Sequence, residues 1–296
     1  MNPTETKELS REQLRDEALC RSVLYGLLSL GLYTPTERTF QELRSETARL
    51  ALREAAQLLT PSAHSTVAQG GEQSRTAKSA RSAESVESVP SGEAENAVDL
   101  ASRAEDWIQA IESLERDVWL TYHSRLFGHT ARGQICPYES EYGHEGLFQQ
   151  PRQLAEIMGF YEAFGLTTRN EERERPDHIS CELEFLDFLS RKEALALEMG
   201  DDASLEETRK AARLFLRDHV GRFGRALARL LAQQDSQGFF AKLGCLLGEL
   251  LTLECSRVGV SPGPLQLELR SAEEDKVPMA CGGNEDLVQI QPTVQL

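Results

Sequence analysis

Five consecutive residues, Glu174-Arg175-Pro176-Asp177-His178, combine carboxylates, an imidazole and a stiff proline at one point of the chain. Apolar residues at helical spacing begin directly after them and predict a helix over 179–199. Asp177 can be the N-cap of that helix, since its carboxylate can accept a backbone N–H and complements the helix dipole. Asp177 and His178 can also offer an acceptor and an adjustable donor to a bound chain. The two interpretations are compatible, because a capping carboxylate still presents its second oxygen.

Acidic residues are concentrated around this motif. Residues 168–207 hold 13 acidic and 5 basic side chains, a local net charge of −8 out of −16 for the whole chain. Such a run usually marks only a solvated face, but here it flanks the motif and favours a cationic ligand. The overall excess of 48 acidic over 32 basic residues disfavours partners that are themselves anionic, namely nucleic acids and anionic membranes.

A second set of chemically suggestive residues lies in the segment 137–142, where Tyr138 and Tyr142 follow a predicted helix. Two tyrosines in a loop are costly to leave fully exposed. They either pack back onto the helices as a lid or form the wall of a groove, where a tyrosine offers an apolar face and a hydroxyl to a bound peptide.

Enzyme motifs offer little to build on. A phosphate-binding G-x-x-x-x-G-K-[ST] loop, a dinucleotide-binding G-x-G-x-x-G and a zinc-binding H-E-x-x-H are absent from the sequence. His123 and His129 stand six residues apart and would lie on different faces of a helix. We therefore expect no catalytic residue, no metal ion and no cofactor. The six cysteines form no C-x-x-C pair, so we expect reduced thiols.

The elements that must position these residues are predicted to be helices throughout. Apolar residues at helical spacing predict helices over 14–32, 36–59, 103–127, 151–164 and 179–199, and two or three more helices that fill 204–231 and 236–258. Residues 60–102 contain no Phe, Trp, Tyr, Ile, Met or Cys, and they predict a disordered insertion whose last residues begin the next helix. We expect one all-α helical bundle with N-terminal helices at 1–59, this insertion at 60–102, the remaining helices at 103–258 and a loosely attached, irregular tail at 259–296.

The chain also lacks the patterns of a membrane or secreted protein. No uninterrupted apolar run approaches the length of a membrane span, and the first 15 residues are polar, without the apolar region of a signal peptide. We expect a soluble cytoplasmic protein that does not insert into a membrane.

Three segments of the chain resemble the TorD/DmsD/NarJ family of molybdoenzyme maturation chaperones. They are residues 21–29 followed by Tyr33 and Pro35, residues 122–127 leading into 137–140, and residues 174–178 running into 182–186. The last differs from the family's common form, Glu-Pro-x-Asp-His, because the proline stands directly before the aspartate. The resemblance covers residues 14–259 apart from the insertion, and it is closest to the chaperones of respiratory enzymes of the dimethyl-sulfoxide-reductase type.

The resemblance implies a chaperone and not an enzyme. Members of the family bind the catalytic subunit of a molybdenum-cofactor enzyme, or its twin-arginine signal peptide, and hold it for cofactor insertion and assembly before export. A twin-arginine peptide needs carboxylates for its guanidinium groups and an apolar groove for the stretch that follows. The residues expected to bind it are Asp177, His178, Glu174 and Pro176, with Tyr25, Tyr138 and Tyr142 bordering the groove.

Alternatives stay open at this point. A chaperone of the same family could bind only the mature part of its client, without contact to a signal peptide. A metal- or nucleotide-dependent hydrolase could use Asp177 and His178, and a plain helical scaffold would have no specific partner. The sequence also leaves a homodimer open, since helical domains with long insertions can exchange elements between protomers.

Overall fold

The structure, a computed structural model, describes residues 9–60, 99–128, 133–143, 149–167, 174–234 and 238–270. Within these ranges the chain forms helices and no β-strand, which confirms the predicted all-α class. The helices are α1 (Arg11–Leu32), α2 (Glu37–Arg44), α3 (Glu46–Leu59), α4 (Leu100–Glu112), α5 (Arg116–Phe127), a 3₁₀ helix η1 (Glu139–Glu141), α6 (Gln149–Ala163), α7 (Ile179–Met199), α8 (Asp202–Asp218), α9 (Val220–Gln234) and α10 (Phe239–Arg257). Most of the predicted insertion, residues 61–98, lies outside the described residues, and so does the chain after residue 270.

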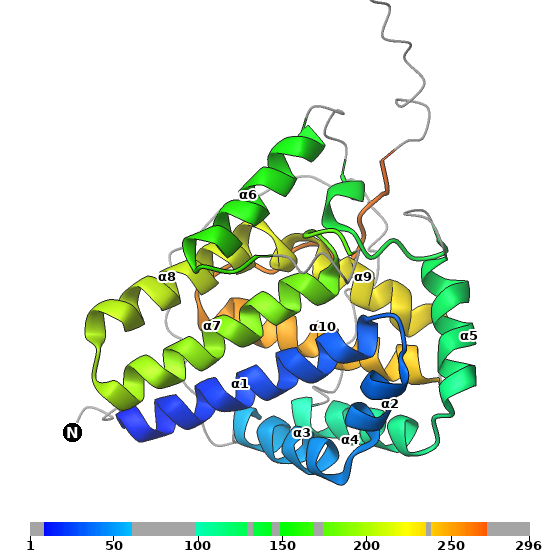
Figure 1. The fold of residues 1–296 in the computed structure, drawn as a ribbon, viewed down its shortest axis with the longest axis horizontal. Helices are drawn as coiled ribbons and strands as arrows, with labels where there is room; N and C mark the ends of the chain where they lie inside the picture. The colour runs from blue at the N-terminus through cyan, green and yellow to red at the C-terminus, as the bar shows by residue number, and fades with distance from the viewer. Residues whose placement is uncertain are drawn as a thin grey trace, which may run out of the picture.

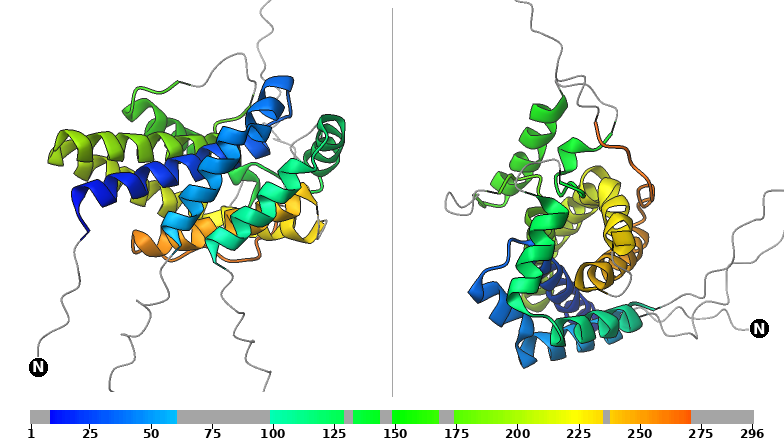
Figure 2. Two further views of the ribbon diagram at one scale, coloured as in Figure 1. Left: turned by 90° about the horizontal axis from the view of Figure 1, so that it is seen from below. Right: turned by 90° about the vertical axis from the view of Figure 1, so that its right-hand side faces the viewer.

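The centre of the fold is the pairing of α1 with α7, which run side by side (Figure 1). α10 packs against α9 and α4, and α3 packs against α1 and α4 (Figures 1 and 2). The stripe predicted for α7 is buried in this core, and it consists of Ile179, Leu183, Leu186 and Leu189. Burying each such side chain fully contributes roughly 1.5–3 kcal/mol, so this stripe holds α7 firmly in the bundle.

Local sequence signals set the ends of the two central helices. Ser10 caps α1 in a reciprocal capping box with Gln13. α7 ends at Gly200, whose φ of 69° is the left-handed conformation that glycine adopts without steric cost. Gly31, inside α1, serves packing instead, because a Cβ atom there would stand 2.7 Å from the side chain of Leu243 on α10.

Two segments predicted as single helices are each broken in two. The segment 36–59 forms α2 and α3, which meet at Ser45, and the segment 103–127 belongs to α4 and α5, which are separated by residues 113–115. These two predictions were wrong because the apolar spacing continues across each break.

Arg44 ties the two breaks together. Its guanidinium donates to the carbonyl oxygens of Glu112 (3.2 Å) and Leu114 (3.1 Å), both at the end of α4. These carbonyl groups would otherwise lack partners where the helix ends. The break therefore depends on a residue 68 positions or more away in the sequence, which local periodicity does not reveal.

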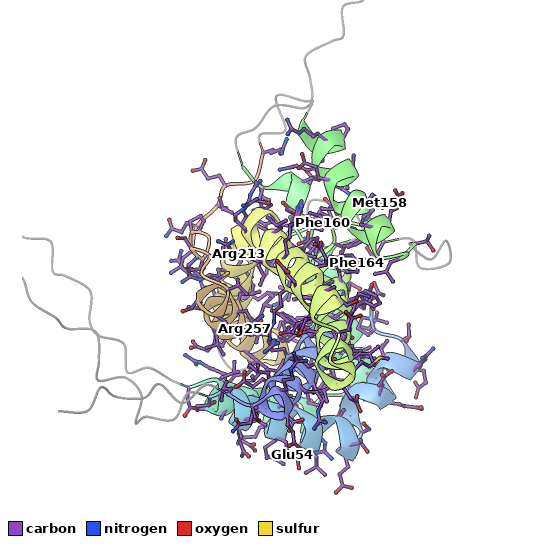
Figure 3. All side chains as sticks on the ribbon, turned by 90° about the vertical axis from the view of Figure 1, so that its left-hand side faces the viewer. Glu54, Met158, Phe160, Phe164, Arg213 and Arg257 are labelled. Carbon is purple, nitrogen blue, oxygen red and sulfur yellow. The ribbon has the colours of Figure 1, made fainter. Side chains whose placement is uncertain are left out.

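α6 packs through aromatic rings onto α7 and α8 (Figure 3). The Phe160 ring lies 5.3 Å from that of Phe215 in an edge-to-face arrangement, and Phe164 lies 5.8 Å from Phe185. The short helix predicted over 151–164 is confirmed with bounds shifted by one or two residues.

The start of the predicted tail is attached to the domain. In the C-terminal strap, as we call residues 260–270, the N–H of Gly263 donates to the carbonyl oxygen of Gly221 (2.9 Å). Farther along, Gly143 N–H donates to the carbonyl oxygen of Glu268 (2.9 Å) and Arg270 N–H to that of Glu141 (2.9 Å). The expectation of a loosely attached tail is therefore corrected for the strap, which these backbone hydrogen bonds hold.

In the part of the chain that the structure describes, no helix is both long and apolar enough to cross a membrane.

Candidate functional site

The three segments that carry the family resemblance meet at the start of α7. Tyr138 and His178 form an isolated antiparallel β-bridge, in which Glu139 N–H donates to the carbonyl oxygen of Asp177 and Ile179 N–H to that of Pro137, each at 2.9 Å. The bridge joins the second segment to the third.

The first segment reaches the same place from the end of α1. The Tyr33 ring stacks on the His178 imidazole with ring centroids 6.1 Å apart. The Ser29 hydroxyl donates to the carbonyl oxygen of Ser180 (3.0 Å). The resemblance thus has a structural basis, because its three segments form one contact network around His178.

Asp177 is not the N-cap of α7. Its side chain is fully buried (0% exposed), and one carboxylate oxygen accepts the backbone N–H of Ser140 (3.1 Å). The Arg175 guanidinium donates to both oxygens, at 3.0 and 2.8 Å. The capping prediction was wrong because Arg175 and the loop before η1 engage the carboxylate. The actual N-cap is His178, whose Nδ1 accepts the backbone N–H of Ser180 (3.1 Å).

His178 is enclosed and uncharged at neutral pH. It is 4% exposed, with Tyr33 on one side and the edge-on ring of Tyr138 on another. Burial lowers the pKa of His178 from 6.5 to about 3, and the charges of His123 and Arg175 act in the same direction. The structure therefore encloses the predicted adjustable donor instead of presenting it to a bound chain.

Arg175, a member of the motif to which sequence analysis gave no role, is the centre of the candidate site. Its guanidinium also donates to Glu141 Oε1 (3.0 Å) and to the Ser140 hydroxyl, and it lies over the Tyr138 ring, 4.5 Å from the centroid. We call Tyr138, Ser140, Glu141 and Asp177 the Arg175 cradle. The Arg175 side chain is 31% exposed, so it connects the buried carboxylate of Asp177 with solvent.

Glu174 and Pro176 lie at the border of the cradle, and both are partly exposed. The Tyr138 hydroxyl donates to Glu174 Oε2 (3.2 Å), which adds a further carboxylate to the rim. The carbonyl oxygen of Pro176 accepts the Tyr161 hydroxyl (2.9 Å) and so anchors the motif to α6.

Further carboxyl groups are buried close to Asp177. Glu139 and the ring nitrogen Nδ1 of His219 share a hydrogen bond (3.1 Å), and both residues are buried. Glu182 is fully buried, and burial together with the charges of Glu139 and Asp177 raises its pKa well above the ordinary 4.5. The shift favours the protonated form of Glu182, as expected when several carboxyl groups share a buried site.

Two of the three tyrosines expected beside a groove are core residues. Tyr25 is buried and donates to Glu254 on α10 (3.2 Å), and Tyr142 is buried and donates to the carbonyl oxygen of Cys136 (2.7 Å). Neither offers its ring to a ligand, because the polar end of each side chain has found a partner inside the domain. Tyr138 is partly exposed and belongs to the cradle.

An apolar cavity of about 400 Å³ lies between the end of α4, helix α5 and the start of α10. Its lining includes Leu114, Val118, Trp119, Tyr122, Phe239 and Phe240. A cavity of this size can hold one or two apolar side chains of a ligand. Its wall is connected to the cradle, because His123, next to Tyr122, contacts the carbonyl oxygen of Leu32 (3.3 Å), and the next residue, Tyr33, stacks on His178.

Two kinds of enzyme chemistry can be checked directly in the structure. Among the described residues, no group of three or more His, Cys, Asp or Glu side chains is arranged to hold a metal ion. Residues 259–263 have the G-x-S-x-G spacing of a hydrolase nucleophile, a match that sequence analysis overlooked. They follow α10 and continue into the strap, whereas such a nucleophile needs a turn from a strand into a helix.

Comparison with known proteins supports the family resemblance. Residues 91–229, which include the whole Arg175 cradle, match the family model described as nitrate reductase delta subunit. The selenate reductase assembly chaperone protein of Thauera selenatis is 38% identical over 117 residues, which is 40% of this chain and 55% of that protein. The resemblance is confirmed.

A second such chaperone gives the same result. The chlorate reductase assembly chaperone protein of Ideonella dechloratans is 37% identical over 122 residues, or 41% of this chain and 58% of that protein. The chain thus spans just over half the length of these two assembly chaperones. No solved structure matches the chain.

Proposed function

We propose that this protein is a cytoplasmic assembly chaperone for the catalytic subunit of a molybdenum-cofactor enzyme, which it holds for cofactor insertion before export. The observation that carries the proposal is the Arg175 cradle, whose carboxylates and tyrosine hold a partly exposed guanidinium inside the region that matches the family. The similar proteins named above are assembly chaperones of reductases. A negatively charged site of this kind suits a basic segment of a client protein.

The twin-arginine signal peptide is the client segment that fits these features best. Its two guanidinium groups would pair with the carboxylates of Glu141 and Glu174 at the rim of the cradle, where planar bidentate contacts are strong. The apolar stretch that follows would use the cavity beside α5. In this proposal Tyr138, Glu141 and Glu174 contact the peptide directly, and Asp177 meets it once Arg175 has turned away. His178 and Pro176 position the loop, and Tyr25 and Tyr142 support the core.

A hydrolase reaction at Asp177 and His178 receives little support. A general base must reach the proton it removes, but Asp177 is fully buried and its two oxygens are occupied by Arg175 and Ser140. The Nδ1 atom of His178 accepts the N–H of Ser180. Phosphate release with added nucleotide, together with metal analysis of the purified protein, tests this alternative; turnover that depends on either residue would overturn the chaperone proposal.

Affinity purification of the tagged full-length protein from its native cells tests the proposed function. We expect mass spectrometry to identify the catalytic subunit of a molybdoenzyme at near-stoichiometric amount. A folded bait that retains no such subunit would contradict the proposal. Retention of a subunit from which the signal peptide has been deleted, at undiminished affinity, would favour the alternative in which the chaperone binds only the mature part.

A further inference from the structure

We propose that the Arg175 cradle is a binding site for the arginine side chain of a partner, and that Arg175 occupies it in the absence of the partner as a built-in competitor. The inference rests on the proposed function for the source of the arginine, but the guanidinium site itself does not depend on it. Binding of the partner would then exchange one guanidinium for another in the same set of contacts.

The contacts of Arg175 are those that any guanidinium would make. The Asp177 carboxylate accepts two of its N–H groups and the Glu141 carboxylate accepts a third. The Tyr138 ring lies against the face of the guanidinium. Bidentate carboxylate pairing and stacking on tyrosine are the interactions by which proteins recognise arginine and discriminate it from lysine. The cradle is therefore specific for this chemical group.

The cradle does not need Arg175 to hold its parts together. The loop and the motif are already joined by the backbone hydrogen bonds from Glu139 to Asp177 and from Ile179 to Pro137. The N–H of Ser140 adds a bond to the Asp177 carboxylate. Since these bonds keep the carboxylates in place, a guanidinium from another chain would find the same geometry after Arg175 has turned away.

The charge at the site exceeds what Arg175 can balance. It contacts Asp177 and Glu141, and Glu174 is joined to the same cluster through Tyr138. Three carboxyl groups therefore surround one guanidinium at this site. An additional cation is favoured there.

The exposure of Arg175 makes the exchange feasible. About a third of its side chain is exposed (31%), whereas the carboxylate that it covers is fully buried. Arg175 can leave by rotating its own side-chain bonds into solvent, with no rearrangement of a helix. Arg175 can also return to the cradle readily, because it lies only two residues from Asp177 in the sequence.

The test is chemical rescue of an emptied cradle in the full-length protein. Arg175→Ala should leave the carboxylates without their cation and lower the melting temperature. Methylguanidinium at millimolar concentration should then raise it again, while methylammonium should not, because an ammonium lacks the planar pair of donors. Arg152→Ala is the matched control: it removes an exposed arginine that pairs with Glu156 (2.9 Å), and its melting temperature should not respond selectively.

Binding of N-acetyl-arginine amide provides the second measurement. Calorimetry should show it binding Arg175→Ala at least about tenfold more tightly than the wild type, the effect of regaining one bidentate charged contact. If Arg175→Ala does not fold, Arg175→Lys takes its place. This variant keeps the charge but loses the planar pair of donors, and it should also bind the ligand more tightly than the wild type.

Two results would overturn the inference. They are equal binding of the arginine ligand to wild type and variant, and equal responses to methylguanidinium and methylammonium. Either would show that Arg175 is a structural residue only. Selective rescue in a protein that copurifies with no molybdoenzyme subunit would instead leave the guanidinium site standing and refute the proposed function. The two failures are thus distinguishable.

Discussion

Two arginines, Arg21 and Arg175, sit at the centres of two ionic clusters that use the same chemistry in different surroundings. Arg21 on α1 is 2% exposed, and its guanidinium donates to Glu193 on α7 (2.7 Å) and lies 3.7 Å from Glu254 on α10. Arg175 is partly exposed and contacts carboxylates of its own loop and of the segment beside it. The first cluster joins three helices, and the second joins two loops.

This difference separates a structural cluster from the site for which we propose binding. In the Arg21 cluster each glutamate has a second arginine: Arg209 pairs with Glu193 (2.7 Å) and Arg257 with Glu254 (2.8 Å). Arg257 lies on α10 (Figure 3). Every carboxylate of the Arg21 cluster thus has its cations within the domain. In our proposal the carboxyl groups of the Arg175 cradle exchange their occupant for the arginine of a partner, so that the cradle takes part in recognition.

The largest expected effect is on folding stability and comes from the Arg21 cluster. Arg21→Met should lower the free energy of unfolding by about 3 kcal/mol, at the lower end of the range for breaking a buried pair, because both glutamates keep a second partner. Denaturant unfolding followed by circular dichroism measures this loss. Arg175→Ala should lose clearly less in the same assay, since its charge is partly solvated. Equal losses would erase the distinction between the two clusters.

A pH effect should come from His178. Its pKa is about 3 in the folded protein against 6.5 ordinarily, so between these values the unfolded chain takes up a proton that the folded chain does not. The contribution of His178 to the free energy of unfolding is fully present above pH 6.5. It is lost as the pH falls below this value, by up to about 1.4 kcal/mol per pH unit. His178→Asn keeps a capping acceptor but does not titrate. Unfolding measured from pH 4 to pH 7 should show a shallower slope for this variant; an unchanged slope would mean that His178 titrates normally.

A smaller effect, opposite in sign, should come from Glu182. Its raised pKa means that the folded chain keeps a proton that the unfolded chain releases above about pH 4.5, so this residue lowers stability as the pH rises. Glu182→Gln should therefore stabilise the protein at pH 7, and the gain should vanish below pH 4.5. Thermal unfolding of both proteins at pH 4 and pH 7 measures this difference. Destabilisation at pH 7 would show that Glu182 is ionised and paired.

Sequence patterns predicted the parts of the fold that local signals control. The helix over 179–199 has the predicted bounds, because its apolar stripe ends at a glycine that adopts the left-handed conformation. The break at residues 113–115 could not be predicted in this way, since it depends on hydrogen bonds from the distant Arg44. Local periodicity carries no information about such a partner.

The two segments chosen for the candidate site lie together, but several residues in them have other contacts than the sequence predicted. The motif at 174–178 and the loop at 137–142 do form one cluster. Asp177 was mistaken for the cap because nothing in a sequence shows that Arg175 and Ser140 would both bind its carboxylate. Tyr25 was expected at a groove, yet its hydroxyl meets Glu254, 229 residues later in the chain, inside the core.

The most direct test of the account is a calorimetric titration of the full-length wild-type protein with the signal peptide of the copurified subunit. A second peptide in which lysines replace the two arginines is the matched ligand. We expect the twin-arginine peptide to bind at least about tenfold more tightly, because lysine cannot form the bidentate contacts of the cradle. Glu174→Gln should reduce that preference. Equal affinities for the two peptides, or no binding of either while the mature subunit still binds, would contradict recognition of the signal peptide at the Arg175 cradle.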